Sequence, residues 1–288
     1  MPICIECKHP VKTLWTEYSR AHGQSGGRGI RLSVCRNCGR FCDKYVEHDY
    51  VIIFIDLVLI KPQVYRHILH NMLMREGDRF DPSIIRLGVL LLLFDVYLTW
   101  EGIEKQAPPA IFPGGSNLGS MAQRPILVQY LFFLILSISS TLALHLSIRF
   151  LACSPYSPLS ALQVMPRYTR PNSVSTALFV SSYARLFPIL LVIWKHDVPA
   201  AARSPLRWAV VANNVEGLRI LLDCKYYIAF ILVVSGAVSR WATGRIILIG
   251  AGLGDVDPIS DSSVAADGKA LWDLFTMTIG WAGRLARG

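Results

Sequence analysis

Two short cysteine motifs decide the first domain of this chain: Cys4-Ile5-Glu6-Cys7 and Cys35-Arg36-Asn37-Cys38. Each motif places two thiolates on one tight turn, and 27 residues separate the motifs. Structural zinc sites have four soft ligands at the corners of a tetrahedron, with Zn–S distances of about 2.3 Å. Paired CxxC motifs therefore predict a zinc site in which four cysteines leave no open position for catalysis. The four predicted ligands are Cys4, Cys7, Cys35 and Cys38.

The stretch between the two motifs predicts a short β-hairpin that ends in a flexible loop. It is longer than the roughly 15–20 residues common between such pairs. The glycine-rich segment 22–29 explains the excess length, because flexible loops tolerate insertion. Two disulfides are the alternative reading. The segment after Met1 is polar and does not resemble a signal peptide, so we expect the cysteines to face a reducing cytosol, which favours metal binding.

Three further cysteines lie outside the two motifs. Cys42 is interpreted either as a small buried hydrophobic residue or as an alternative ligand, and the first reading is favoured. Cys153 and Cys224 lie among apolar residues and are expected to be packing residues.

The composition predicts a soluble module followed by a membrane region. The chain is 52% hydrophobic and 17% charged, against about 25% charged in soluble domains. The first 83 residues hold 12 of the 29 Lys and Arg and 9 of the 20 Asp and Glu, a net charge of +3. No Lys/Arg-rich run is present in the sequence, so the net charge of +9 is assigned to lipid headgroups rather than to nucleic acid.

Apolar stretches predict a membrane bundle of about four helical spans. One of them has 24 residues without a charge, and about 20 suffice to cross a bilayer. The predicted spans are 84–100, 125–148, 174–194 and 226–253. The expected fold is a small N-terminal zinc-ribbon-like α+β domain (1–80), an α-helical multi-span membrane bundle (81–255) and a C-terminal tail (256–288).

Two other segments are predicted to form amphipathic or interfacial helices. The charges of the loops predict the orientation of the chain in the membrane. Residues 208–223 are mixed in polarity, and 271–286 has tryptophans beside arginines, as interfacial helices do. The loop 149–173 carries three arginines and no acid, whereas Lys105 and Arg124 are the only basic residues of 101–124. The positive-inside rule therefore places the N-terminus in the cytosol and, with four spans, the C-terminus too.

The apolar segment 51–60 is too short to span a bilayer. It is expected to be a helix packed near the membrane, in preference to a strand or a core element of the zinc domain. Polar residues in and after it are candidates for contact with lipids or their headgroups. They are Asp56, Lys61, Tyr65 and Arg66.

Asp95 and Arg185 are the ionisable residues deepest in the predicted spans. Such residues are costly in lipid and usually face the bundle interior. They could form a structural pair with each other or line a path for polar headgroups, and the structural role is favoured.

Several blocks of the first quarter of the chain resemble the Arv proteins, endoplasmic-reticulum membrane proteins of sterol and lipid homeostasis. The glycine-rich segment between Ser19 and Ile30 is longer than the family pattern. The matching blocks are 4–7, 14–19, 30–32, 43–47, 51–57, Lys61, 65–67 and Asn71.

The resemblance implies a non-enzymatic protein of the endoplasmic-reticulum membrane, with the Golgi membrane as a second location. It implies support of sterol trafficking, with roles in sphingolipid metabolism and glycosylphosphatidylinositol precursor delivery. The implied partners are membrane lipids, sterols above all, and lipid-synthesis membrane proteins. A scaffold or regulator of lipid-synthesis enzymes is the alternative. A lipid enzyme is disfavoured because His145 and His196 stand apart from any catalytic constellation in the sequence.

Overall fold

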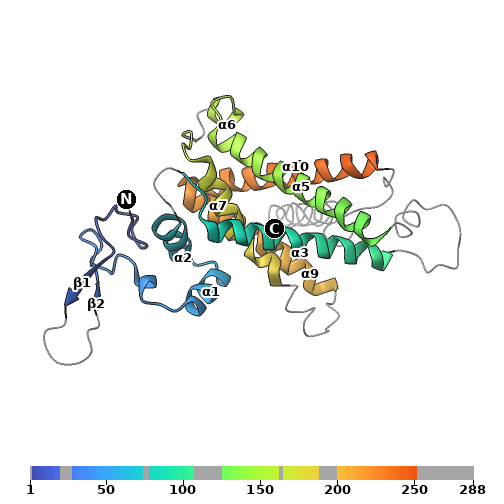
Figure 1. Ribbon diagram of the computed structural model, residues 1–288. Coiled ribbons are helices and arrows are strands. Elements are labelled where there is room, and N and C mark those ends of the chain that lie inside the picture. The colour runs from blue at the N-terminus through green and yellow to red at the C-terminus, as the bar shows by residue number, and fades with distance from the viewer. Residues whose placement is uncertain are drawn as a thin grey trace, which may run out of the picture. The chain divides into compact units, whose positions relative to one another are not determined.

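The computed structural model of the chain describes residues 2–19, 28–73, 78–106, 125–161, 165–187 and 200–251 (Figure 1). The chain divides into two compact units. Unit 1 holds residues 1–87 and 152–230, and unit 2 holds residues 88–151 and 231–288. The N-terminal domain is therefore in the same unit as residues 152–230, although residues 88–151 of the other unit lie between them in the sequence.

The N-terminal domain contains one antiparallel hairpin, of β1 (Trp15–Ser19) and β2 (Arg28–Leu32). Its register pairs Trp15 with Leu32 and Glu17 with Ile30. Aromatic and β-branched residues favour such strands. The hairpin predicted between the two cysteine motifs is confirmed, and its glycine-rich connection lies outside the described residues.

Short helices follow the hairpin: η1 (Lys44–Val46), α1 (Tyr50–Val58), α2 (Pro62–Arg66) and the π-helix η2 (His67–Met72). The prediction of a helix over 51–60 is confirmed. Ile60 adopts a left-handed φ of 54°, which ends the helix, and the Lys61 backbone N–H donates to the Asp56 carbonyl at 3.1 Å. Pro62 then begins α2, since the first helical position needs no N–H donor.

The other described residues of unit 1 are mainly helical. It contains α6 (Pro158–Ala161), α7 (Pro171–Ser181), the 3-10 helix η3 (Ser182–Leu186) and α9 (Ala200–Leu222). The helix predicted over 208–223 is confirmed, although it begins earlier; residues 208–222 are buried or half-buried except for the exposed Ala212, so its predicted amphipathic character stays a prediction. Asp78 caps α7, because its carboxylate accepts the backbone N–H groups of Asn172 and Ser173 at 3.0 Å each. Helices α7 and α9 approach closely at Gly217, where a Cβ atom would lie 3.2 Å from Ser181.

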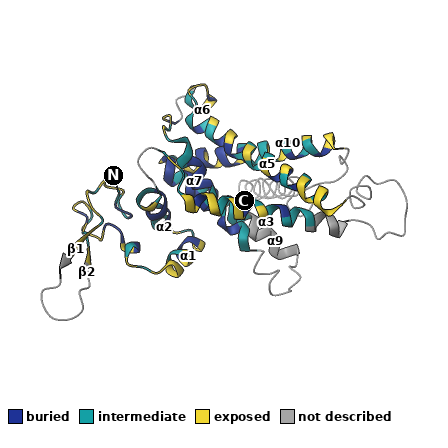
Figure 2. Cartoon of the chain, viewed as in Figure 1, coloured by how far each residue is buried: buried dark blue, intermediate teal, exposed yellow. Residues whose placement is uncertain are grey.

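Three helices in the described part of the chain are long and apolar enough to cross a membrane. They are α3 (Pro82–Gln106), α5 (Ile126–Cys153) and α10 (Tyr226–Gly250). The core of unit 2 comprises Val96, Phe133, Leu136 and Leu248. Many other apolar side chains of these helices are exposed (Figure 2), as expected where lipid replaces water.

The stretch 174–194 is not a continuous long helix where it is described. Helix α7 ends at Ser181, and η3 carries the chain to Leu186. Residues 188–199 and the tail 256–288 lie outside the described residues, so the count of four spans and the interfacial helix over 271–286 stay predictions. The segment 165–187 instead packs with the N-terminal domain, because the Tyr183 hydroxyl donates to the Leu57 carbonyl at 2.9 Å.

Contacts inside unit 1 predict that the described segments 152–161, 165–187 and 200–225 share one membrane face with the N-terminal domain. Asp78 precedes α3 yet caps α7, and Tyr65 bonds Asn213 of α9. We expect a glycosylation acceptor inserted beside the exposed Tyr156 and one inserted in the β1–β2 hairpin to be either both glycosylated or both unmodified. An acceptor inserted within 107–124, which is separated from the hairpin by one predicted crossing, should have the opposite glycosylation state. Gel mobility with and without a glycosidase measures this, and opposite behaviour at Tyr156 and the hairpin would contradict it.

A candidate metal centre and the side chains that hold it

The two cysteine motifs meet in one cluster. The sulfur atoms of Cys4, Cys7, Cys35 and Cys38 all lie within 4.8 Å of one another. The close contacts join one motif to the other, with Sγ–Sγ distances of 3.8 Å for Cys4–Cys38 and 3.6 Å for Cys7–Cys35. A tetrahedron with Zn–S bonds of about 2.3 Å has edges of about 3.8 Å. The four sulfurs therefore have the spacing that a tetrahedral metal requires, and the cysteines are free rather than joined in disulfides.

The two motifs form equivalent turns. The residue after the second cysteine of each motif donates its backbone N–H to the first cysteine's carbonyl, from Lys8 to Cys4 at 3.0 Å and from Gly39 to Cys35 at 2.9 Å. Both residues adopt a left-handed backbone, with φ of 63° at Lys8 and 70° at Gly39. Glycine takes this conformation without steric cost, whereas lysine does not. Gly39 is thus a signal in the sequence for the turn, and Lys8 could be recognised only from the structure.

The environments of the four sulfurs differ. A hydrogen bond from the Asn37 side chain lowers the pKa of the Cys7 thiol to about 6, whereas burial raises the pKa of Cys4 to about 12. A bound metal has to displace protons from such thiols, so its affinity falls as the pH falls.

Cys42 is also buried, but it lies outside the four-sulfur group, and burial raises the pKa of its thiol. Its position agrees with the packing role.

A buried carboxylate connects the cysteine turns to the helices that follow. Asp43 is completely buried and accepts three hydrogen bonds, from the Tyr45 backbone N–H at 3.0 Å, the Asn71 amide at 2.7 Å and His67 Nδ1 at 2.7 Å. Asn71 in turn pairs with both backbone groups of Ile3, at 2.9 and 3.0 Å. We call Asp43, Arg66, His67 and Asn71 the polar clasp, because they hold the first cysteine turn against α2 and η2.

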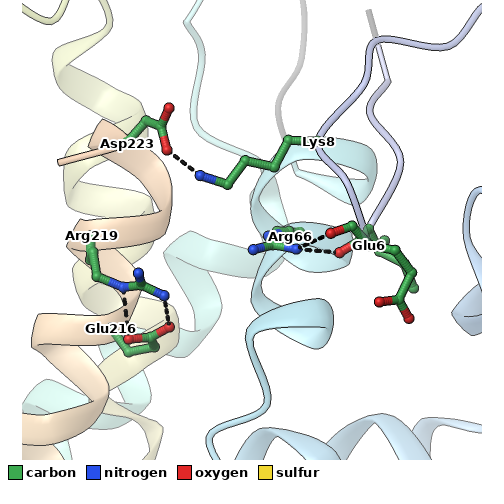
Figure 3. Close-up of polar contacts among 7 residues, drawn as sticks. Glu6, Lys8, Arg66, Glu216, Arg219 and Asp223 are labelled. Carbon is green, nitrogen blue, oxygen red and sulfur yellow. Dashed lines mark hydrogen bonds and ion pairs between the residues drawn. The ribbon is translucent and has the colours of Figure 1, made fainter. Parts of the chain in front are cut away.

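Arg66 is the fourth member of the polar clasp. Its Nη1 donates to the carbonyl of Ile5 at 2.6 Å and to that of Glu6 at 2.9 Å (Figure 3). Lys8 of the same turn forms an ion pair with Asp223, at the end of α9. The first cysteine turn is therefore attached both to α2 and to the helical part of unit 1.

The other candidates for headgroup contact also have internal partners. The Asp56 carboxylate is buried and accepts from the Tyr45 hydroxyl at 2.7 Å and from Lys61 Nζ at 2.6 Å. The Lys61 ammonium, aided by the Tyr45 hydroxyl, holds the pKa of Asp56 below its ordinary value. Tyr65 is completely buried, and its hydroxyl donates to Asn213 at 2.6 Å. These contacts assign a structural role to each residue, and contact with headgroups stays a prediction.

The intramembrane aspartate has a different partner from the one that the sequence suggested. Asp95 of α3 accepts from Arg240 Nη2 of α10 at 2.6 Å, rather than from Arg185. Arg185 lies in η3. Arg240 was missed because the predicted span 226–253 contains it without indicating which way its side chain faces. The pair neutralises two charges on neighbouring apolar helices, which agrees with the favoured structural role.

We expect Cys35→Ser or Cys38→Ser to abolish metal binding and unfold the N-terminal domain. Structural zinc supplies on the order of 10 kcal/mol of folding free energy in small domains. Elemental analysis and protease sensitivity of the purified full chain measure both effects. Cys42→Ala is the matched control and should retain the metal. Acidification should release metal from the intact chain. A Cys35→Ser chain whose N-terminal domain is metal-free and still folded would contradict the assignment.

The polar clasp predicts a second effect. Asp43→Asn keeps the side-chain shape but removes the charge that three donors face, so local opening of the N-terminal domain should become easier by about 1.5–3 kcal/mol. Amide hydrogen exchange of residues 2–19 and 28–46 in the full chain measures this. Asp49→Asn is the control, since Asp49 is exposed and makes no side-chain cap hydrogen bond. Equal exchange in the two variants would show that Asp43 does not hold the turn.

Known proteins match this chain over most of its length. The model of the Arv1-like family matches residues 3–218. Protein arv1 of Schizosaccharomyces pombe is 34% identical over 256 residues, which are 88% of each chain. Protein ARV1 of Homo sapiens is 28% identical, over 81% of this chain and 77% of its own. Protein ARV1 of Saccharomyces cerevisiae is 26% identical, over 86% and 90%. No solved structure matches. The cysteine cluster, the polar clasp, helices α3 and α5 and most of α9 fall within the matched residues, and the chain belongs to the Arv1-like family.

Proposed function

We propose that this protein maintains sterol homeostasis in the endoplasmic-reticulum membrane, by supporting the trafficking of sterols and their distribution into membranes. The observation that carries the proposal is the family match, which extends over residues 3–218. Sphingolipid metabolism and delivery of glycosylphosphatidylinositol precursors are further roles that the resemblance to Arv proteins supports. The Golgi membrane is a second location, and lipid-synthesis membrane proteins are proposed partners.

The proposed metal is a structural Zn2+ held by Cys4, Cys7, Cys35 and Cys38. The sulfur spacing supports it, and thiolates are ligands that zinc prefers. The metal would hold together a hairpin and two turns that have few other buried apolar residues. Its contribution to lipid homeostasis would be structural: it fixes a domain that binds or presents lipid at the cytosolic bilayer surface.

A scaffold or regulator of lipid-synthesis enzymes is the second candidate function. Internal hydrogen bonds of the polar clasp and of Asp56 support this candidate, because these polar groups already have partners within the domain. The proposal excludes catalysis at the metal, since four cysteine ligands fill a tetrahedral zinc. The names of the relatives are not those of enzymes.

Cells that lack the protein test the proposal. We expect free sterol to accumulate in the endoplasmic reticulum and to decrease in the plasma membrane. The intact chain and Cys42→Ala should restore the distribution, whereas Cys35→Ser should not. Fractionation followed by sterol quantification measures each case, at matched protein levels.

An unchanged sterol distribution would contradict the sterol proposal. Accumulation of glycolipid precursors in the same cells would then assign the protein to precursor delivery. Restoration by Cys35→Ser, if that variant lacks its metal, would separate the function from the metal centre.

A further inference from the structure

Helix α1 is almost entirely apolar and largely uncovered. Its sequence is Tyr50-Val51-Ile52-Ile53-Phe54-Ile55-Asp56-Leu57-Val58. Asp56 and Leu57 are its buried residues. The exposed fractions of Tyr50, Val51 and Leu59 are 80%, 67% and 61%. The other exposed apolar residues of this segment are Ile52, Phe54, Ile55 and Val58.

The exposed side chains form one continuous arc. At about 100° per residue, positions 50, 51, 52, 54, 55, 58 and 59 cover about 200° of the helix circumference. The remaining side carries Asp56 and Leu57, which face the protein. A stripe of about 100° suffices for a surface helix that packs on a globular core. Most of the wide arc on α1 is therefore additional to the face that holds the helix in place, and within the arc Phe54 is half-exposed and also contacts other rings of this chain.

The only charge within α1 is turned away from this arc. Asp56 is paired with Lys61 and accepts from Tyr45, so its carboxylate is neutralised on the protein side. Beyond the helix, Lys44 and Lys61 are exposed, and so are Glu47 and Asp49, so the border of the face carries charges of both signs. A charge in the middle of the face would oppose insertion, and the arc itself has none.

Aromatic contacts attach α1 to a later segment of unit 1. Phe54 contacts the rings of Tyr183 and Phe187, with centroids 6.1 and 6.2 Å away. The same unit contains the first turns of α3 and α10, where Ile85 and Phe230 are also exposed apolar residues. Two of the predicted spans therefore begin in the unit that contains α1.

We propose that the exposed arc of α1, residues 50, 51, 52, 54, 55, 58 and 59, lies in the boundary between headgroups and acyl chains of the bilayer. The occupant of this face is lipid because the face is wide, uncharged and part of the unit from which the spans begin. The contact differs from the one expected from the sequence: apolar side chains meet the lipid, and Asp56, Tyr65 and Arg66 hold the helix from behind. This inference does not depend on sterol as the cargo.

The test uses the full chain in phosphatidylcholine nanodiscs, with an environment-sensitive fluorescent amino acid at one position. The test position is Ile55, and Thr16, exposed on β1, is the water-facing control. Leu93, exposed in the middle of α3, is the reference for deep lipid. Nitroxide-labelled phospholipids act as quenchers, labelled near the headgroup or near the end of the acyl chain. Retained metal shows that each variant keeps its N-terminal domain.

At Ile55 we expect a blue shift and stronger quenching by the label near the headgroup than by the deep label. Leu93 should show the reverse order, and Thr16 should show neither effect. Emission at Ile55 like that at Thr16 would overturn the proposal. A blue shift without quenching by any lipid would overturn it too, because it would mean that protein, from this chain or a second copy, covers the face.

A charged variant tests whether the arc itself inserts. With the fluorescent residue at Leu59, the double change Val51→Glu and Ile55→Glu should abolish quenching by lipid. Glu47→Gln changes an exposed charge outside the arc and should leave the quenching intact. Quenching that persists in the double variant would overturn the proposal, since lipid would then meet Leu59 without the apolar arc.

Discussion

The convergence of four thiolates on one point is the constraint on which the N-terminal domain depends. The hairpin has only two strands, and two-stranded hairpins are marginal on their own in water. The cysteine turns close the chain at both ends of the hairpin, and a metal among their sulfurs would link residues that are far apart in sequence. Cys4 and Cys35 are buried at the centre of this arrangement, and Cys42 packs beside them.

The polar clasp extends that constraint from the domain to the helices. Arg66 of α2 donates to the carbonyl of Ile5 in the first cysteine turn, and Asp43 accepts from the amide of Asn71 in η2. The residues that a metal would order therefore also position α2 and η2. Tyr65 then reaches Asn213 of α9, and Lys8 reaches Asp223. A continuous series of contacts within unit 1 thus joins the candidate metal centre to the segment that leads into α10.

This arrangement explains why a block of polar residues follows the cysteine motifs. Lys61, Tyr65, Arg66, His67 and Asn71 were recognised from the sequence as part of a family pattern, and contact with headgroups was a reasonable expectation for several of them. In the folded protein each of Lys61, Tyr65, Arg66, His67 and Asn71 is bonded to another part of unit 1. Their chemistry holds the domain together, and the apolar arc of α1 is left to meet the bilayer.

The sequence by itself determined the four cysteines that cluster, the hairpin between them, the helix over 51–60 and three long apolar helices. These features depend on local spacing, local composition and length, which can be read along the chain. Only the tertiary structure decided the partners of the polar residues, such as Asp43 with His67 or Asp95 with Arg240, and the side of α1 that remains uncovered. It also showed that the start of the stretch 174–194 packs with the N-terminal domain. Such pairings join residues separated by up to 215 positions, and a single sequence carries no local signal for contacts between segments that meet only when the chain folds.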